Sequence, residues 1–240
     1  MPKAIVIGAT SGIGKALALL YAARGYEVGA TGRRGALLAE LAPQLGAGGI
    51  VRRFDVRRTD EAMAALGALF EDMGDVDVCI VNAGCGHVNP ALDWAKEQAA
   101  IETNVCGFAA MCNVAMRYFT ARGGGRLVGI SSVAGIRGVG GAPAYSASKA
   151  FVSNYLESLR GIARRAGLPV SVTDVRPGFV DTAMGQNPRA FWRISPEEAA
   201  AQIYAAVEDR KSRVYVAARW RWVAMALSIL PDRLVDAMGG

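Results

Sequence analysis

Short apolar segments alternate with longer amphipathic ones along the chain, and this alternation limits the possible folds more than any other feature of the sequence. Residues 4–7 form a β-branched run of a strand's length, and Ile13, Leu17 and Leu20 then recur at helical spacing. Apolar strands separated by helices predict a parallel sheet with both faces covered. We therefore expect an α/β fold: a Rossmann-like, doubly wound parallel sheet of about seven strands with helices on both faces.

The expected strands lie at residues 4–7, 27–31, 50–54, 76–81, 126–131, 170–175 and 213–216, and the expected helices include 60–72, about 104–122 and about 144–166. A further helix is expected to begin at Ser195, followed by Pro196 and by Glu198 in a capping box. A length of 240 residues suits a single domain over 1–240. Within it we expect residues 183–212 to form a substrate lid and 219–240 an apolar C-terminal extension.

The remaining composition narrows the classes of function. The first residues lead directly into a strand without the pattern of a secretory signal, so we expect a cytoplasmic location. The cysteines form no CxxC pair and are expected to be reduced and mostly buried: Cys79, Cys85, Cys106 and Cys112. With His87 as the only histidine we expect no metal site.

The formal net charge of +6 comes mostly from scattered arginines rather than from a clustered stripe. A solvated basic surface therefore explains the charge better than nucleic-acid binding, and we expect no nucleic-acid partner. The same excess of positive charge would suit an anionic cofactor.

A glycine-rich turn, Gly8-Ala9-Thr10-Ser11-Gly12-Ile13-Gly14, separates the first expected strand from the first helix. Glycines there permit a tight turn and a close approach of a pyrophosphate to the helix N-terminus. Such a loop can also be purely structural, but its place after the first strand favours a dinucleotide site.

The end of the second expected strand carries arginines where an NAD site places a carboxylate. The chain there reads Ala30-Thr31-Gly32-Arg33-Arg34. Arg33 and Arg34 would pair with the 2′-phosphate of NADP, which a carboxylate would repel. The alternative is that both arginines are simply exposed at a helix start. We predict that NADP(H) is preferred, with NAD(H) also accommodated.

Tyr145 and Lys149 are four residues apart and so share one face of an expected helix. An exposed pair would have no chemical role, but a nearby ammonium would lower the pKa of a phenol from its ordinary value of about 10. Ser131 and Ser132 end the preceding strand, where a hydroxyl could hydrogen-bond a substrate oxygen or simply belong to a turn.

In these motifs and in their order, the chain resembles the shorter, single-domain branch of the short-chain dehydrogenase/reductases, from Lys3 to about Thr182. The matching motifs are GATSGIG, Asp55-Val56, Asn82-Ala83-Gly84, Asn104 in TNVCG, SSVAG, YSASK and RPGFVDT. Two departures are Val81, where the family often has asparagine, and Ser11, where NADP-binding members sometimes have a basic residue.

The resemblance implies a reaction and a role for each matching residue. It implies hydride transfer between a nicotinamide and a carbonyl/alcohol substrate, with Tyr145 as the acid/base and Ser132 orienting the substrate. Lys149 would bind the nicotinamide ribose and depress the Tyr145 pKa, and Asn104 would hold a proton-passing water. Tyr145 and Lys149 also count among the implied cofactor contacts, and the others are Gly8, Thr10, Ser11, Gly12, Ile13, Gly14, Arg33, Arg34, Asp55, Val56, Asn82, Ala83, Gly84, Pro177, Gly178, Val180 and Thr182.

The substrate side is less constrained by the sequence. The expected walls are Cys85-Gly86-His87, residues 138–143, and residues 184–194 with Phe191 and Trp192. These aromatic side chains favour an apolar substrate, although they would also serve only to exclude water. We interpret His87 as a loop histidine rather than a pocket residue.

The apolar run 222–230 is too short to span a bilayer. We expect it to pack over the pocket or against another subunit, and contact with a membrane surface is the alternative. Homo-oligomers are common among members of the family, so the resemblance implies a homodimer or homotetramer.

Two other functions are compatible with parts of the pattern. A non-catalytic protein of the same fold could bind or sense NADP(H), but it would not need a tuned phenol. A hydrolase using Ser132 would need His87 as its base, and no carboxylate is placed to orient that histidine.

Overall fold

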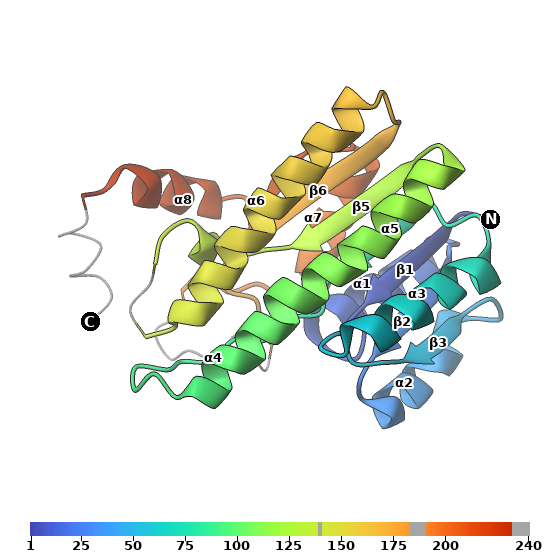
Figure 1. Cartoon of the computed structure of the whole chain (residues 1–240), viewed down its shortest axis with the longest axis horizontal. Coiled ribbons are helices and arrows are strands. Elements are labelled where there is room, and N and C mark those ends of the chain that lie inside the picture. Colours follow the sequence, from blue (N-terminus) through green and yellow to red (C-terminus); the bar gives the residue numbers. More distant parts are fainter. Residues whose placement is uncertain (139–140, 183–190, 232–240) are drawn as a thin grey trace.

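The computed structural model describes residues 1–138, 141–182 and 191–231. Within these residues, seven parallel strands form one sheet in the order β3-β2-β1-β4-β5-β6-β7. Figure 1 shows β2 and β3 on one side of β1 and β5 and β6 on the other. The predicted seven-stranded parallel sheet is therefore confirmed. The strand order reverses between β1 and β4, which is where ligands bind in sheets of this kind. The strands are β1 (Lys3–Ile7), β2 (Glu27–Gly32), β3 (Ile50–Arg53), β4 (Val78–Val81), β5 (Gly125–Ile130), β6 (Val170–Pro177) and β7 (Arg213–Val216).

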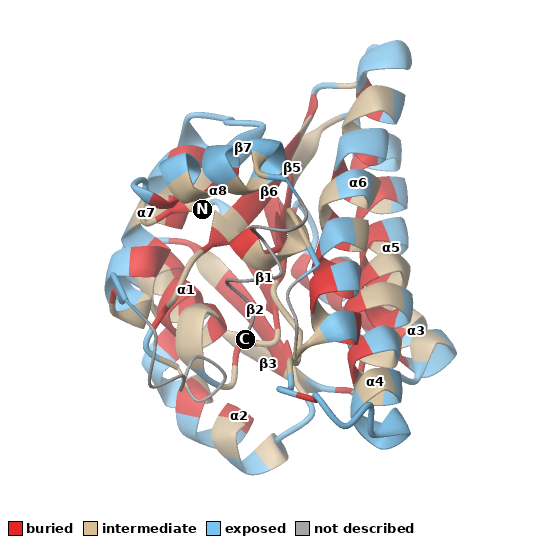
Figure 2. Ribbon diagram, turned by 90° about the vertical axis from the view of Figure 1, so that its left-hand side faces the viewer, coloured by how far each residue is buried: buried red, intermediate tan, exposed pale blue. Residues whose placement is uncertain are grey.

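Helices cover both faces of the sheet (Figure 2). Alternate residues of β1 enter two separate cores, with Ile5 and Ile7 on one face and Ala4 and Val6 on the other. The first core is closed by α3 (Thr59–Met73), α5 (Phe108–Arg122) and α6 (Pro143–Arg165), and the second by α1 (Gly12–Ala23), α2 (Gly35–Leu41), the 3-10 helix Ala42–Leu45 and α7 (Pro196–Glu208).

The helix expected from about residue 104 begins ten residues earlier. A continuous helical segment contains α4 (Trp94–Ile101), a π-helical turn (Glu102–Gly107) and α5. Its start is fixed by Asp93, whose carboxylate accepts a hydrogen bond from Ala95 N at 3.0 Å. Asn104 therefore lies within the helix, at its π-helical turn, rather than at its start.

By length and composition, residues 94–122 would be able to cross a membrane, but half of their most apolar window is buried inside the fold. That burial is typical of the core helix of a sheet protein. The residues are packed on the sheet through α5 and against α6.

The start of α7 agrees with the sequence-based prediction, whereas the burial of the cysteines does not. The capping box at the start of α7 is present: Ser195 Oγ accepts from Glu198 N, and Glu198 Oε2 accepts from Ser195 N, each at 3.0 Å. The expectation of mostly buried thiols is wrong for half of the cysteines, because only Cys79 and Cys112 are buried. Cys106 is exposed on the outward side of the π-helical turn.

The predicted lid and C-terminal extension fall partly outside the described residues, at 183–190 and 232–240. Of the rest, α7 packs against α1, and residues 220–229 form α8 (Trp220–Ile229). The roles given to these two segments stay predictions.

Candidate active site

The site lies at the carboxyl ends of β1, β4, β5 and β6, which are adjacent in the sheet. The turns that follow these strands carry most of the residues that the sequence singles out. In a doubly wound sheet, these turns meet at the edge where ligands bind.

The glycine loop is a backbone cradle that side chains would fill. Gly8 and Gly12 have positive φ angles of +89° and +54°, which disfavour other residues. A Cβ on Gly14 would lie 2.1 Å from Gly8 O and 2.4 Å from Asn82 Nδ2. Asn82 in turn donates to Gly8 O at 2.8 Å and so joins β4 to the loop.

The first turn of α1 is open to an anion. Its N-cap residue, Ser11, makes no capping hydrogen bond with its side chain, and the first turn contains no acidic residue. Free backbone N–H groups at a helix N-terminus, next to a loop without side chains, suit a phosphate. The residues present therefore fit the pyrophosphate of a dinucleotide.

Basic side chains gather beside this loop, at the ends of β2 and β3. The Arg34 guanidinium donates to Thr10 Oγ1 and to Ser11 Oγ, each at 2.6 Å. Arg33 is exposed, and its carbonyl accepts from Arg53 Nε at 3.2 Å. The contribution of Arg53 was missed, because adjacent strand ends cannot be recognised before the strand order is known.

Asp55 follows β3 and is held by a neighbour. Arg57 donates to both carboxylate oxygens at 2.7 to 3.2 Å, and this hydrogen bonding is the main reason that the pKa of Asp55 is lowered. The Arg33 charge lowers the same pKa. Val56 is buried, with its carbonyl and side chain packed against Gly107. The adenine-binding role of Asp55 and Val56 stays a prediction.

Tyr145 and Lys149 lie in the first two turns of α6. The Tyr145 ring packs on the backbone of Gly86, where a Cβ would lie 2.6 Å from the ring's Cδ2 atom. Lys149 Nζ donates to Ile130 O at 2.8 Å and is 5.9 Å from the centre of the Tyr145 ring. The sequence had suggested Gly86 only as part of a pocket wall, not as the surface that seats the tyrosine.

Burial shifts the pKa values of these two groups in opposite directions. Burial raises the pKa of Tyr145, and the hydrogen bond with the Ser132 side chain lowers it by a smaller amount. Burial lowers the pKa of Lys149 to about 8, while the charges of Cys85 and Asp174 act in the raising direction. The expectation that Lys149 lowers the Tyr145 pKa is therefore not met, because desolvation dominates and Ser132 provides the lowering effect.

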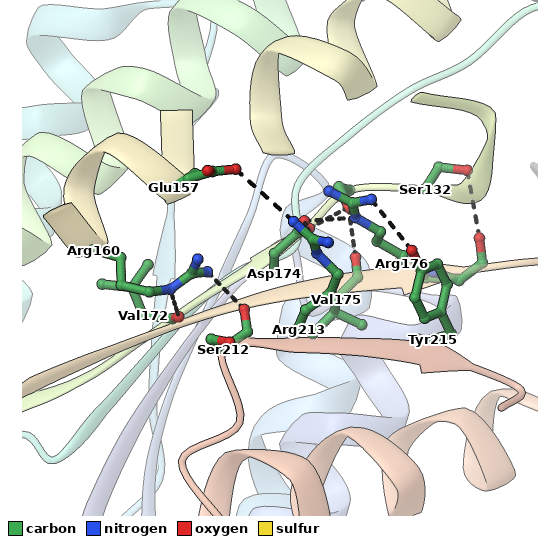
Figure 3. Close-up of polar contacts among 12 residues, drawn as sticks. Ser132, Glu157, Arg160, Val172, Asp174, Val175, Arg176, Ser212, Arg213 and Tyr215 are labelled. Carbon is green, nitrogen blue, oxygen red and sulfur yellow. Dashed lines mark hydrogen bonds and ion pairs between the residues drawn. The ribbon is translucent and has the colours of Figure 1, made fainter. Parts of the chain in front are cut away.

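The two serines after β5 have different environments. Ser131 Oγ is directed at β6, with Asp174 Oδ1 at 2.5 Å and Val175 O at 2.9 Å. Ser132 Oγ accepts from Ala134 N at 3.1 Å and makes a long contact of 3.5 Å with Pro177 O (Figure 3). Ser132, rather than Ser131, is thus the serine whose hydroxyl remains available beside Tyr145.

A short 3-10 helix, Val133–Gly135, packs Ser132 against α6. A Cβ on Gly135 would lie 2.6 Å from the carbonyl carbon of Lys149. The glycine of the SSVAG motif therefore allows the end of β5 to approach the helix that carries the tyrosine and the lysine.

Asp174 is a buried carboxylate beneath this site that the sequence analysis missed. It is 2% exposed and forms an ion pair with Arg176 Nε at 2.7 Å (Figure 3). A carboxylate at the centre of an expected strand was the available signal, because a buried charge requires partners.

Asn104 is fully buried, and its side chain makes three hydrogen bonds. Its Oδ1 accepts from Cys85 N at 2.9 Å, and its Nδ2 donates to Cys85 O at 2.7 Å and to Ser148 Oγ at 2.9 Å. A Cβ on Gly84 would lie 3.2 Å from Asn104 Oδ1 and 3.4 Å from Lys149 Nζ. Because Gly84 has no side chain, the Asn104 amide and the Lys149 ammonium can both approach its backbone. Gly84 follows Ala83, just after the end of β4.

The turn after β6 closes the site from the other side. Gly178 N donates to Val216 O at 2.6 Å, and Val180 forms an isolated bridge with Ile194. A Cβ on Gly12 would lie 2.9 Å from the Thr182 methyl group. The segment from Pro177 to Thr182 therefore reaches the glycine loop and joins the two halves of the predicted cofactor site.

Aromatic side chains cover the outer side of this turn. The Trp220 ring lies on Gly178, with Phe179 at 5.4 Å and Phe191 at 5.1 Å between ring centres. Arg219 donates to Trp192 O at 3.1 Å and lies over the Trp192 ring. The start of α8 therefore packs beside the site, whereas His87 is exposed.

Comparisons with known proteins agree with this geometry. A family model described as short chain dehydrogenase matches residues 2–191. An oxidoreductase of Myxococcus xanthus is 41% identical over 196 residues, 78% of this chain and 77% of the relative. An NADP-dependent 3-hydroxy acid dehydrogenase of Shigella flexneri is 31% identical over 191 residues, 77% of this chain and 75% of the relative. A short chain dehydrogenase/reductase of Burkholderia phymatum, solved with NAD, has a TM-score of 0.84 at 22% identity, over 93% of this chain and 92% of that one.

The chain belongs to the short-chain dehydrogenase/reductase family. It is an oxidoreductase with a Rossmann-type nucleotide-binding fold, and the resemblance stated from the motifs is confirmed.

Proposed function

We propose that the protein is an NADP(H)-dependent oxidoreductase that interconverts a carbonyl compound and its alcohol, with Tyr145 as the acid/base. The observation that carries this proposal is the convergence of Tyr145, Lys149 and Ser132 beside a glycine cradle that fits a pyrophosphate. The family membership supports the reaction class.

Each polar group has a distinct task in the proposed reaction. The nicotinamide, when bound, supplies or accepts the hydride. Because burial raises the Tyr145 pKa, the phenol is protonated at neutral pH and donates its proton to the carbonyl oxygen during reduction. Ser132 would donate to the same oxygen as negative charge develops there.

Lys149 and Asn104 would serve on the cofactor side of the tyrosine. The Lys149 ammonium donates to Ile130 O, and we propose that its remaining N–H groups bind the nicotinamide ribose. Asn104 faces the space above Gly84 close to Lys149, so a water held there would pass protons toward the lysine.

We propose a preference for NADP(H), with NAD(H) also bound. Arg33 and Arg34 lie beside the glycine loop with Arg53, and the Asp55 carboxylate is neutralised by Arg57. An arginine fork pairs well with a 2′-phosphate. The named cofactor of the Shigella flexneri relative supports the same preference.

We propose an apolar carbonyl substrate, because Phe179, Phe191 and Trp220 form an aromatic cluster on the turn after β6, beside the site. A homodimer or homotetramer remains our proposal for the assembly. The face of α8 with Trp222, Met225 and Ile229 is 54% to 76% exposed. That face would serve a second subunit or, as the alternative, peripheral membrane contact.

The alternative function is NADP(H) binding or sensing without catalysis. It is favoured less because such a protein would not require a half-buried phenol hydrogen-bonded to a serine next to the lysine.

The test is NADPH and NADH oxidation with a panel of aldehydes, ketones and acyl carbonyls, using the native chain and Tyr145→Phe. We expect Tyr145→Phe to lower kcat by about 10²- to 10⁴-fold, because a positioned proton donor contributes that much. NADPH binding, followed by its fluorescence, should be retained. Unchanged turnover in Tyr145→Phe would refute the assigned mechanism.

A further inference from the structure

We propose that Glu97 is a positioning residue for the reaction. Its carboxylate caps the helix that carries Tyr145 and ties that helix to the loop on which the tyrosine ring packs. This inference rests on the proposed function, since it assigns Glu97 an effect through the acid/base tyrosine.

The start of α6 lacks a cap of its own. Its N-cap residue, Ala142, makes no side-chain hydrogen bond, and the first turn contains no acidic residue. By contrast, α7 carries a complete capping box within its own sequence. The first N–H groups of α6 must therefore find acceptors elsewhere, since unsatisfied helix ends are costly.

Glu97 supplies that acceptor from α4. Its Oε2 atom accepts a hydrogen bond from Ala144 N at 3.0 Å, and Ala144 directly precedes Tyr145. A carboxylate at this end is also favoured by the helix dipole. A side chain from a different helix thereby fixes the first turn of α6.

The second oxygen of the same carboxylate holds the loop after β4. Glu97 Oε1 accepts from Asn89 Nδ2 at 2.6 Å. Asn89 is 1% exposed, and its amide also bonds the backbone of Asp93 at 2.9 and 3.0 Å. Asn89 N donates to Gly141 O at 2.5 Å, two residues before α6 begins.

This loop after β4 is also the loop on which the Tyr145 ring packs. It contains Gly86, on which the Tyr145 ring packs, and Cys85, whose backbone is bonded by Asn104. Glu97 therefore sets both the turn that bears Tyr145 and the surface beneath its ring. Loss of the carboxylate would leave the Ala144 N–H and one N–H of the Asn89 amide without their acceptor and allow the phenol to shift.

A stability effect alone must be separated from positioning, and Asp77 provides a matched control. Asp77 is also a partly buried carboxylate, and it accepts one backbone N–H, from Lys3 at 2.9 Å, and one side-chain N–H, from Arg122 at 3.0 Å. It precedes β4, at the amino end of the sheet and away from Tyr145.

The experiment compares Glu97→Ala, Glu97→Gln and Asp77→Ala in the full chain, measuring kcat, KM, the NADPH Kd and Tm. We expect Glu97→Ala to lower kcat about 10- to 100-fold, because small displacements of a reacting group cost that much. The NADPH Kd should stay within about 3-fold, because the glycine cradle is untouched. Glu97→Gln keeps an acceptor for Ala144 N and should retain kcat within about 5-fold of the native value. Asp77→Ala should lower Tm with kcat unchanged.

A double variant tests whether Glu97 affects kcat through Tyr145. In a Tyr145→Phe background, Glu97→Ala should cause no further loss, since both act through the same group. A native kcat in Glu97→Ala, an equal kcat loss in Asp77→Ala, or additive losses in the double variant would each overturn the proposal. If Glu97→Ala does not fold, Glu97→Asp replaces it, because its carboxylate is one methylene shorter and cannot reach both Ala144 N and the Asn89 amide. Asp77→Asn is then the control, and a native kcat in Glu97→Asp or equal kcat losses in these two variants overturn the proposal. Failure of the proposed function is distinct, because Tyr145→Phe alone would then leave turnover unchanged.

Discussion

Burial shifts the pKa values of Tyr145 and Lys149 in opposite directions. Burial favours the neutral form of both, which raises the tyrosine pKa and lowers the lysine pKa to about 8. The phenol therefore remains a proton donor over the neutral range. The lysine changes charge at a pH at which the reaction can be assayed.

The titration of Lys149 predicts how kcat/KM depends on pH. The folded-state pKa of Lys149 lies below its ordinary value of 10.5, so the ammonium persists below about pH 8 and is lost above it. We expect kcat/KM for carbonyl reduction to fall as pH rises through about 8, because the ammonium is the ribose donor in the proposed mechanism. By linkage, this lysine should also make the fold more stable as pH rises from about 8 to 10.5.

The buried Asp174 gives this pH profile a control. Its charge raises the Lys149 pKa, so Asp174→Asn should move the inflection in kcat/KM to lower pH. An inflection that stays in place would contradict the assignment to Lys149.

Another residue-level prediction concerns the choice of cofactor. Arg33→Ala should raise the NADPH Kd about 10- to 100-fold, because a hydrogen bond to a charged group contributes roughly 1.5–3 kcal/mol. The NADH Kd should change by less than about 2-fold, since NADH has no 2′-phosphate. Titrations followed by NAD(P)H fluorescence measure both constants, and equal losses would undo the preference for NADP(H).

At the level of elements, the close contact between α1 and β1 depends on Gly14. A Cβ there would meet Gly8 O at 2.1 Å, so Gly14→Ala should destabilise the fold by about 1–3 kcal/mol through overpacking. NADPH binding should weaken as well, because the Asn82–Gly8 hydrogen bond lies in the same contact. Denaturant unfolding and NADPH titration measure the two effects.

Gly67 is the matched control within α3, since nothing lies within 4 Å of a Cβ built there. Gly67→Ala should stabilise the fold by about 0.5–1 kcal/mol through helix propensity, with NADPH binding unchanged. A stability gain in Gly14→Ala as well would show that the close contact is not required.

The sequence predicted the sheet, because strands are local patterns. The residues of its motifs lie together in the candidate site, and their roles stay predictions. The sequence missed the start of the helix at Trp94, since that start depends on Asp93 within a stretch of weak periodicity. It also missed Arg53 and Asp174, which join the site through neighbouring strands. The pKa of Tyr145 was predicted in the wrong direction, because burial follows from packing rather than from the spacing of two residues.

At the level of the whole molecule, the two halves of the chain contribute different parts of one site. The glycine cradle and the arginines come from β1–β3, and the tyrosine, lysine and serine come from β5 and α6. The parallel order brings the ends of β1, β4 and β5 together. The reaction thus depends on both halves of the sheet.

The most direct test is the transfer of deuterium from NADPH that carries deuterium at both hydrogen positions of the nicotinamide C4 to a carbonyl substrate found in the panel. The account predicts product carrying one deuterium on the former carbonyl carbon with the native chain, and almost no product with Tyr145→Phe at saturating NADPH. Product without the label, or labelled product formed equally fast by Tyr145→Phe, would contradict it.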